Sequence, residues 1–382
     1  MATKVMLVFG TRPEAIKMAP LVKELEKRDT FDVKVCVTAQ HREMLDQVLE
    51  IFKIKPDYDL NIMTKGQTLA GITTKALEGL CEVMAKEKPD LVLVHGDTTT
   101  TFVAALAAFY NQIKVGHVEA GLRTYDKYSP YPEEMNRVLT TRLTDIYFAP
   151  TENNKNNLIK EAIDESKIFV TGNTAVDAMK YTVTSDYKFD DEELNKVDFE
   201  NKKVILMTAH RRENLGEPLE NICNAVKETV TMNPGVDVIY PVHLNPIVQN
   251  TARSILGNMP NVHLIDPLDA MTFQNVMNKS YMVMTDSGGV QEEAPSLGKP
   301  VLVLRTETER PEAIATGTLK LAGTNKDNIV KLANELLNDK TEYERMSHAK
   351  NPYGDGNASQ RIADAIEFMF EQRTDKPKEF HI

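Results

Sequence analysis

The sequence predicts an α/β protein with two doubly wound domains, each a parallel sheet with helices on both faces. Three observations predict this. Short apolar runs of strand length alternate with amphipathic helix patterns, as in repeated strand–helix units. The alternation occurs twice, on either side of a polar, acidic stretch at residues 183–202. The chain has 382 residues, more than one ordinary hydrophobic core holds.

The sequence pattern of the first half of the chain predicts six strands and the helices between them. A helix should begin near Pro13, because proline is favoured in a first helical turn, and further helices are predicted at about 41–52, at 68–88 and after Pro132. The predicted strands are Val5–Phe9, Val33–Thr38, Leu91–Val94, Lys114–Val118, Ile146–Ala149 and Phe169–Val170.

The second half repeats this alternation from Lys203 onward. We interpret residues 183–202 as a solvated helix or loop near the domain junction. The periodicity of the last helix, at about Ser359–Glu371, leaves open which domain it packs on. We place the first domain at residues 1–172, the second at 173–357 and a C-terminal segment at 358–382. The predicted strands are Val204–Thr208, Val236–Val242, Val262–Ile265, Tyr281–Met284 and Pro300–Leu304, with helices such as Leu219–Met232 and Asn328–Leu337.

The composition excludes several classes of partner. The chain has 45 Lys and Arg against 56 Asp and Glu, a net charge of −11, which disfavours nucleic acid and anionic membranes. An anionic ligand therefore needs a local basic pocket. Cys36, Cys81 and Cys223 lie in apolar patterns and are interpreted as reduced core thiols. With no CxxC or HExxH motif, no metal is expected, and with no membrane-length apolar run or signal peptide the protein is expected to be cytoplasmic.

Carboxylates follow two neighbouring predicted strands. Asp97 comes after Leu91–Val94, Glu119 comes after Lys114–Val118, and Glu133 lies shortly downstream. Ligands of an open parallel sheet bind outside the carboxyl ends of its strands, so Asp97 and Glu119 should face one crevice. Paired carboxylates suit general acid and base chemistry, because neighbouring charges push their pKa values apart. The alternative for Asp97 is a capping role at the start of the next helix.

A stretch of small residues, Thr285-Asp286-Ser287-Gly288-Gly289, follows a predicted strand and opens a helix. Backbone N–H groups at such a place can approach a phosphate, and the helix dipole favours the negative charge. Glu293 lies one turn inside, where it can accept hydrogen bonds from a ribose; its alternative is a solvated helix charge. The absence of GxGxxG and GxxxxGK[ST] disfavours dinucleotide and P-loop sites.

Basic side chains lie near these loops. Arg12 and Lys17 fall in the first loop and helix, and Arg310 follows the last predicted strand. Arginine suits bidentate phosphate contact, although each of these residues taken singly is better explained as a surface charge. His210 and His243 end neighbouring strands beside arginines, a pattern that favours anion binding over two structural histidines.

The motifs GTRPEAIKMAPL, TAQHREMLDQ, VHGDTTTT, GHVEAGLRT, YSPYPEEMNR, TAHRREN, YPVHLNP, TDSGGVQEEAPSLGKPVLVLR, TERPEA and NPYGDG occur together over nearly the whole chain. Their joint occurrence resembles the non-hydrolysing UDP-N-acetylglucosamine 2-epimerases of bacteria. The resemblance implies a GT-B fold, in which two Rossmann-like domains flank a cleft and the C-terminal helix returns to the N-terminal domain. It also implies a homodimer that needs neither NAD nor a metal.

The reaction implied by the resemblance is the interconversion of UDP-N-acetylglucosamine and UDP-N-acetylmannosamine, which supplies N-acetylmannosamine for surface polysaccharides. The family eliminates UDP to give 2-acetamidoglucal and then adds UDP back with the C2 proton on the other face. Three related functions stay open: a hydrolysing 2-epimerase, a GT-B glycosyltransferase with an acceptor site, and a UDP-sugar sensor without turnover.

The resemblance also implies residue roles. The candidate catalytic residues are Asp97, Glu119, Glu133 and His210. The implied substrate-binding residues are Arg12, Lys17, Arg137 and Arg310 for the charged groups, Ser287, Gly288 and Gly289 for the phosphates, Glu293 for the ribose, and Leu268 and Phe273 for the uracil. The family has an effector site for a second UDP-N-acetylglucosamine, and the matching positions are Gln40, Glu133, Arg211 and His243.

Overall fold

The computed structural model describes residues 2–40, 42–64, 66–308 and 310–382. The chain divides into two compact units, which we call the N-terminal unit (Met1–Tyr181 with Tyr353–His381) and the C-terminal unit (Thr182–Pro352 with Ile382). These limits differ from the expected 172 and 357 because two chain segments hydrogen-bond to each other. The N–H of Asn173 donates to the carbonyl of Tyr353 at 2.6 Å, and that of Ser359 to Asp177 Oδ1 at 2.7 Å.

The N-terminal unit is built on a parallel sheet whose seven described strands have the order β3-β2-β1-β4-β5-β6-β7. The order reverses between β1 and β4, which makes the carboxyl ends of these strands the topological switch point. The strands are β1 (Thr3–Phe9), β2 (Phe31–Val37), β3 (Tyr58–Asp59), β4 (Leu91–His95), β5 (Lys114–Val118), β6 (Ile146–Ala149) and β7 (Ile168–Val170).

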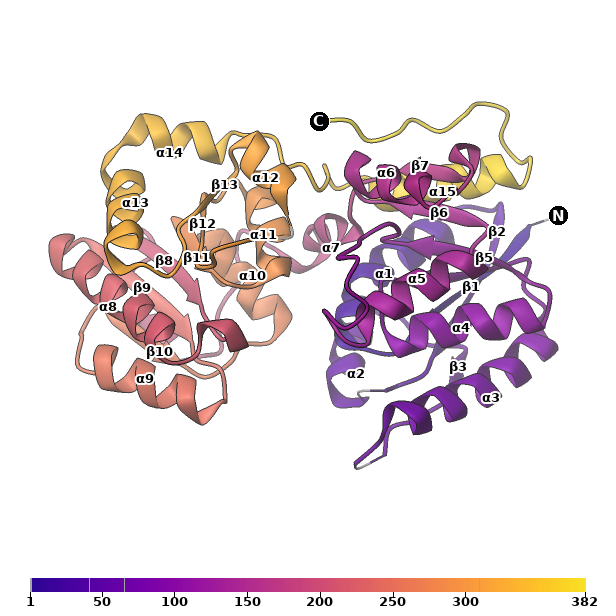
Figure 1. Ribbon diagram of the computed structural model, residues 1–382, viewed down its shortest axis with the longest axis horizontal. Coiled ribbons are helices and arrows are strands. Elements are labelled where there is room, and N and C mark those ends of the chain that lie inside the picture. The colour runs from indigo at the N-terminus through magenta and orange to yellow at the C-terminus, as the bar shows by residue number, and fades with distance from the viewer. Residues whose placement is uncertain (1, 41, 65, 309) are drawn as a thin grey trace. The chain divides into compact units, whose positions relative to one another are not determined.

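Helices cover both faces of this sheet (Figure 1). Alternate residues of β1 enter different cores, since successive strand residues point to opposite faces: Leu7 joins the core under α1, α2 and α15, and Val8 joins the core under α3 and α4. The helices are α1 (Arg12–Glu26), α2 (Arg42–Ile51), α3 (Leu69–Glu87), α4 (Thr99–Tyr110), α5 (Glu133–Leu143), α6 (Glu152–Lys160), α7 (Thr174–Thr182) and α15 (Ala358–Met369).

The last helix, α15, packs against α1, although hundreds of residues separate them in the sequence (Figure 1). Ile362 and Ile366 are fully buried in the same core as Leu25. Arg28 adds ion pairs to Asp364 at 2.7 Å and Glu367 at 3.0 Å. The last helix therefore packs on the N-terminal unit, as the resemblance implied.

The C-terminal unit is a second parallel sheet, and its six described strands have the order β10-β9-β8-β11-β12-β13. This is the 3-2-1-4-5-6 order of dinucleotide-binding domains, with the switch point between β8 and β11. The elements are β8 (Lys203–Thr208), α8 (Glu217–Met232), β9 (Val236–Pro241), α9 (Pro246–Leu256), β10 (Val262–Ile265), α10 (Ala270–Lys279), β11 (Met282–Thr285), α11 (Gly288–Glu293), β12 (Val301–Val303), α12 (Pro311–Thr316), β13 (Leu319–Leu321), α13 (Lys326–Asn338) and α14 (Lys340–Ser347).

The predicted fold class, two Rossmann-like parallel-sheet domains, is confirmed. The short strands β3 and β13, of two and three residues, were not predicted. The stretch 183–202 was expected to be a solvated helix or loop; it is a loop with one 3₁₀ turn, and it buries Phe189 and Leu194. Among the described residues, no helix is both long and apolar enough to cross a membrane.

Candidate active site

The loop after β1 begins at a glycine, and any larger residue there would force neighbouring side chains to move. A Cβ at Gly10 would lie 2.0 Å from Thr38 Oγ1 and 2.6 Å from Thr100 Oγ1. The carboxylate of Glu14 then ties the two sides of the switch point together. It accepts hydrogen bonds from the N–H of Thr11 at 2.8 Å and from Thr98 Oγ1, at the start of α4, at 2.6 Å. Burial raises the pKa of Glu14, although these hydrogen bonds favour its charged form.

Glu119 is the centre of a cluster at this sheet edge, which we call the Glu119 cluster (Lys17, His95, Glu119 and Asn173). Its backbone φ is +63°, a conformation that costs energy in a non-glycine residue and is common at functional sites. Its Oε2 accepts hydrogen bonds from Lys17 Nζ and from Asn173 Nδ2, the latter at 2.9 Å. His95 Nε2 lies 3.7 Å from the same oxygen.

Burial and charge oppose each other in this cluster. Burial disfavours the charged form of Glu119, but the Lys17 ammonium and the surrounding hydrogen-bond donors together outweigh it and hold the pKa of Glu119 well below its usual range. His95 is 4% exposed, and burial lowers the pKa of its imidazole to about 3. Glu119 is therefore a carboxylate and His95 a neutral imidazole at neutral pH.

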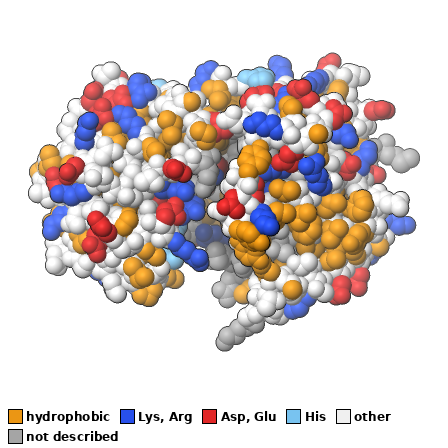
Figure 2. All heavy atoms as spheres, in the orientation of Figure 1, with side chains coloured by type: hydrophobic (Ala, Val, Ile, Leu, Met, Phe, Trp, Pro, Cys, Tyr) orange, Lys and Arg blue, Asp and Glu red, His pale blue; other side chains and the backbone are white. Residues whose placement is uncertain are grey.

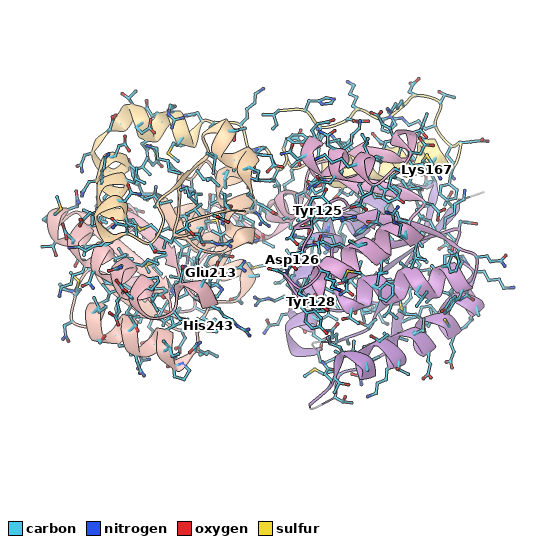
Figure 3. All side chains as sticks on the ribbon, viewed as in Figure 1. Tyr125, Asp126, Tyr128, Lys167, Glu213 and His243 are labelled. Atoms are coloured by element: carbon cyan, nitrogen blue, oxygen red, sulfur yellow. The ribbon has the colours of Figure 1, made fainter. Side chains whose placement is uncertain are left out.

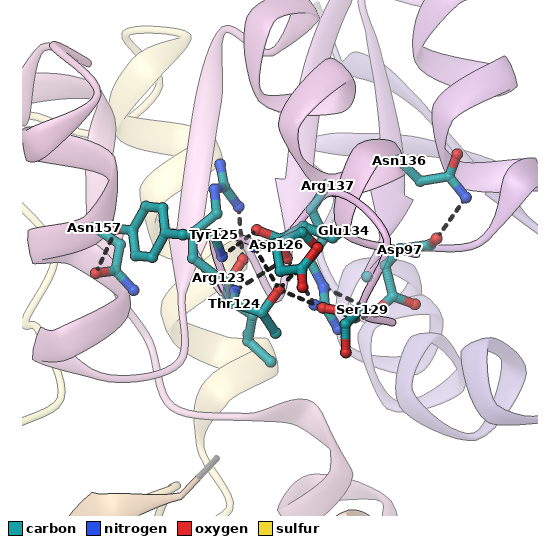
Figure 4. A network of polar contacts seen from close by, with 12 residues as sticks. Asp97, Arg123, Thr124, Tyr125, Asp126, Ser129, Glu134, Asn136, Arg137 and Asn157 are labelled. Atoms are coloured by element: carbon teal, nitrogen blue, oxygen red, sulfur yellow. Dashed lines mark hydrogen bonds and ion pairs between the residues drawn. The ribbon is translucent and has the colours of Figure 1, made fainter. Parts of the chain in front are cut away.

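Asp97 is held by an arginine from α5. Asp97 Oδ2 accepts hydrogen bonds from Arg137 Nε at 3.0 Å and Nη2 at 2.6 Å, and Nη1 of the same guanidinium donates to Glu134 at 3.1 Å (Figure 4). The capping alternative for Asp97 is wrong, because Thr98 caps α4: its Oγ1 accepts the N–H of Thr101 at 3.1 Å. Arg137, expected among the substrate-binding residues, contacts a candidate catalytic carboxylate.

Glu134 anchors the loop between β5 and α5. Its side chain is buried and accepts the backbone N–H groups of Thr124 at 3.1 Å and Tyr125 at 2.9 Å. The same loop carries the exposed rings of Tyr125 and Tyr128 (Figure 3). The carboxylate of Glu134 therefore holds this loop in place. Its neighbour Glu133 is half-buried and is the first residue of α5.

Two further predicted residues lie near the β1–β4 edge. The side-chain oxygen of Gln40 accepts a hydrogen bond from Thr100 Oγ1 at 3.3 Å. Arg12 is the first residue of α1 and is half-buried. Its guanidinium makes no hydrogen bond or ion pair with any residue that the structure describes, which suits a group expected to meet an anion.

Asp286 organises the switch point of the C-terminal unit. It is fully buried, and its Oδ2 accepts the N–H groups of His210 at 2.7 Å and Arg211 at 2.8 Å and the side-chain amide of Asn214 at 3.0 Å. The two backbone contacts fix the turn that follows β8. Burial lowers the pKa of His210 even though the Asp286 charge acts in the opposite direction.

The two predicted histidines of this unit lie together. The rings of His210 and His243 stack with centroids 5.2 Å apart and planes 5° from parallel. His243 is exposed two residues beyond β9 (Figure 3), and its Nδ1 accepts the N–H of Asn245 at 3.0 Å. Arg211 follows His210 in the sequence, so the three predicted basic residues of this unit lie together beyond the carboxyl ends of β8 and β9.

Arg310 lies against the glycine turn after β11. A Cβ at Gly288 would be 2.8 Å from Arg310 Nη1, so the absence of a side chain there makes room for the guanidinium. Arg310 Nε and Nη2 contact Glu292 Oε1 at 2.8 and 2.7 Å. Ser287 is the N-cap residue of α11, and Gly288 and Gly289 are its first two residues. The expected phosphate-binding residues and their arginine are thus adjacent.

The residues expected to bind the nucleoside lie around α10. Glu293 Oε2 accepts a hydrogen bond from Gln274 Nε2 at 3.2 Å, so it is not simply a solvated charge. Phe273 precedes this glutamine on α10, Leu268 lies in the loop before the helix, and both are half-buried. Helix α10 therefore carries Gln274, which hydrogen-bonds the ribose candidate Glu293, and also Phe273, a candidate for contact with the uracil.

Sequence reasoning missed several residues of these sites. His95 and Asp286 stood within the quoted motifs, but nothing in a motif shows that a side chain is buried against a functional group. Asn173 and Gln274 gave no signal, because each meets its carboxylate through packing of distant segments. Glu134 was indistinguishable from Glu133 in the sequence.

Comparisons with known proteins agree with this picture. The family model UDP-N-acetylglucosamine 2-epimerase matches residues 23–367. The UDP-N-acetylglucosamine 2-epimerase of Bacillus subtilis is 59% identical over 377 residues, covering 99% of this chain and 98% of that protein. The crystal structure of UDP-GlcNAc 2-epimerase from Neisseria meningitidis bound to UDP-GlcNAc is 53% identical, with a TM-score of 0.86 over 95% of this chain and 99% of that chain.

A more distant likeness bears on the fold alone. The crystal structure of the glycosyltransferase of kitacinnamycin is 13% identical, with a TM-score of 0.64 over 96% of this chain and 98% of that chain. The GT-B fold expected from the motifs is therefore confirmed by neighbours of both kinds, epimerases and a glycosyltransferase. The chain belongs to the UDP-N-acetylglucosamine 2-epimerase family.

Proposed function

We propose that this protein interconverts UDP-N-acetylglucosamine and UDP-N-acetylmannosamine by inverting C2 without net hydrolysis, and that it needs neither NAD nor a metal. The observation that carries the proposal is Glu119, a largely buried carboxylate at positive φ that is held by Lys17 at the carboxyl end of β5. The sugar product would supply N-acetylmannosamine for surface polysaccharide.

The chemistry explains why carboxylates and cations are both required. The C2 hydrogen of the sugar is not acidic enough for simple deprotonation. In the proposed elimination, one carboxylate takes the C2 proton while the C1–O bond breaks, its electron pair leaves with UDP, and a C1=C2 double bond forms in 2-acetamidoglucal. Re-addition reverses each step with protonation on the other face. Asp97, Glu119 and Glu133 are the candidate proton carriers.

The leaving diphosphate needs positive charge where its own negative charge develops. In the C-terminal unit, Arg310 beside Gly288 and the nearby Ser287 and Gly289 would hold the phosphates, with His210 as a further contact. Lys17 and Arg12 are the cations that the N-terminal unit offers. We propose that Glu293 binds the ribose and that Leu268 and Phe273 contact the uracil.

The test is a proton NMR time course of UDP-N-acetylglucosamine in heavy water with no acceptor added. We expect the epimer to appear with deuterium at C2, because the proton is lost to a group that exchanges with solvent. An epimer without deuterium at C2 would contradict elimination and re-addition. Free UDP with N-acetylmannosamine would mean a hydrolysing enzyme, and binding without turnover would favour a glycosyltransferase or a sensor.

We also propose that the protein is a homodimer formed through α4 and its neighbours. Hydrophobic side chains gather over α4 on the face of the N-terminal unit in Figure 2, and Phe109 and Tyr110 are 58% and 60% exposed. Exposed apolar patches of this kind mark interfaces. Phe109→Glu should turn a dimer into a monomer in sedimentation velocity, whereas Met232→Glu, at an equally exposed apolar residue of α8, should not. A monomeric wild type would remove the proposal.

Gln40, Glu133, Arg211 and His243 are candidates for a regulatory site. We propose that UDP-N-acetylglucosamine also activates the enzyme through Gln40, Glu133, Arg211 and His243. The reverse reaction, started from UDP-N-acetylmannosamine alone, should then show a lag that a trace of UDP-N-acetylglucosamine removes. His243→Ala should blunt this response and Leu244→Ala, at the exposed neighbour, should not. Equal initial rates with and without the trace would mean that no effector acts.

A further inference from the structure

The Glu119 cluster contains a histidine that the proposed chemistry has not yet used. His95 Nε2 is buried, has no hydrogen-bond partner within the described part of the chain, and lies 3.7 Å from Glu119 Oε2. Buried ring nitrogens are usually satisfied, so an unpaired one beside a catalytic candidate calls for an explanation. His117 on β5 is equally buried; its Nε2 lies 2.8 Å from the carbonyl of Gly96, and its Nδ1 has no hydrogen-bond partner among the described residues and, unlike His95 Nε2, no ion-pair contact with Glu119 there.

The other two partners of Glu119 stabilise one of its protonation states. Lys17 Nζ and Asn173 Nδ2 both act as hydrogen-bond donors, and donors favour the carboxylate. A general base or acid must also exist as the neutral carboxylic acid for part of each turnover. That form carries an O–H donor, which neither an ammonium nor an amide N–H group can accept.

We propose that His95 is a positioning residue that accepts the hydrogen bond of protonated Glu119 through Nε2. The inference rests on the proposed function, because it assigns a role to the proton that Glu119 would carry. Burial keeps the imidazole neutral, as an acceptor requires, with a pKa of about 3. A separation of 3.7 Å is longer than a hydrogen bond, and catalytic contacts of this kind tighten when the proton arrives.

The C-terminal unit offers a matched control, which we call the Asp237 cluster (Lys202, Asp237 and His263). Lys202 Nζ contacts Asp237 Oδ1 at 2.8 Å, and His263 Nε2 lies 3.5 Å from Asp237 Oδ2, also without a hydrogen-bond partner in the described structure. The carboxylate, the lysine and the histidine recur, without a counterpart of Asn173, but Asp237 is the second residue of β9 and lies at the amino end of the strand. Replacing His263 therefore shows how the loss of a similarly placed histidine affects kcat and stability when the histidine lies away from the candidate active site.

The experiment compares His95→Met, which replaces the ring nitrogen with a much weaker acceptor at similar size, with His95→Gln, which keeps a strong one. We expect His95→Met to lower kcat by about 10- to 100-fold with KM and UDP affinity nearly unchanged, and His95→Gln to recover most of the loss. The limb of the kcat–pH profile that reports Glu119 should move to lower pH in His95→Met, because the acid form loses its acceptor. The charged or titratable groups facing Glu119 in that profile are Lys17, His95 and His117.

The variants distinguish a positioning role of His95 from a packing role. Equal losses in His95→Met and His95→Gln, or a lower melting temperature with wild-type kcat, would show that His95 only packs. His263→Met should leave kcat and the pH profile unchanged; a matching loss there would point to general destabilisation and would overturn the inference. If the wild-type protein in the same assay makes no epimer, the proposed function fails first and the role of His95 fails with it.

Discussion

The Glu119 cluster and the Asp237 cluster each contain a carboxylate, a lysine and a histidine, but their surroundings differ. In each, a largely buried carboxylate contacts a lysine and faces a histidine Nε2 at 3.5–3.7 Å. Glu119 follows the end of β5 with φ of +63°, whereas Asp237 lies within β9, in register with Val204 of β8. Ligands of parallel sheets meet the carboxyl ends of strands, so the Glu119 cluster is at the functional edge.

The Asp237 cluster lies beside a cavity. The Asp237 cluster lines a cavity of about 490 Å³ together with Glu193 and Lys196 of the loop between the domains. These two side chains pair with each other, and Lys202 already neutralises Asp237. Paired charge is therefore present in both clusters, and strand polarity with the positive φ of Glu119 is what separates them.

The largest expected contrast comes from neutralising each carboxylate. Glu119→Gln should reduce turnover by ~10²–10⁴-fold, because it removes proton transfer while keeping shape. Asp97→Asn should act similarly, and both variants should still bind UDP. Asp237→Asn should leave turnover within a few-fold of wild type. Steady-state rates with calorimetric UDP titrations check all three, and wild-type rates in Glu119→Gln would make its cluster as structural as the other.

The same contrast between edge and remote positions extends to arginine pairs. Arg310→Ala should weaken UDP binding by about 1.5–3 kcal/mol, the value of a charge-assisted contact. Arg345 also pairs with a glutamate, Glu342, through two contacts of 2.7 Å, but it is half exposed at the end of α14. Arg345→Ala should therefore leave UDP affinity unchanged in calorimetry. Unchanged affinity in Arg310→Ala would remove that residue from the nucleotide site.

A smaller effect should appear in the pH dependence of stability. Burial lowers the pKa of His95 from 6.5 to about 3, so the unfolded chain takes up a proton first as pH falls. The stability that this group contributes is full above pH 6.5 and is lost on acidification. The loss should be about 2 kcal/mol between pH 7 and 5. Denaturant unfolding of His95→Gln should show a correspondingly shallower dependence, and an identical slope would mean that His95 titrates normally when folded.

The sequence predicted the parts of the site that depend on local pattern. An apolar run followed by an acid placed Asp97 and Glu119 at strand ends, and a strand followed by small residues placed Gly288 at a helix start. Periodicity also predicted the main strands and helices to within a few residues. These features could be predicted because strand alternation and turn formation depend mainly on residues that are close in the sequence.

Sequence by itself determined two parallel-sheet units, their family and the carboxyl-edge residues. Tertiary structure decided the strand order, the return of α15 to the N-terminal unit, and the partner of each charged group. Arg137 meets Asp97 across 40 residues, and Asn173 meets Glu119 across 54. The physical reason is that protonation and orientation depend on burial and on short distances, and packing alone brings such distant residues within hydrogen-bond range.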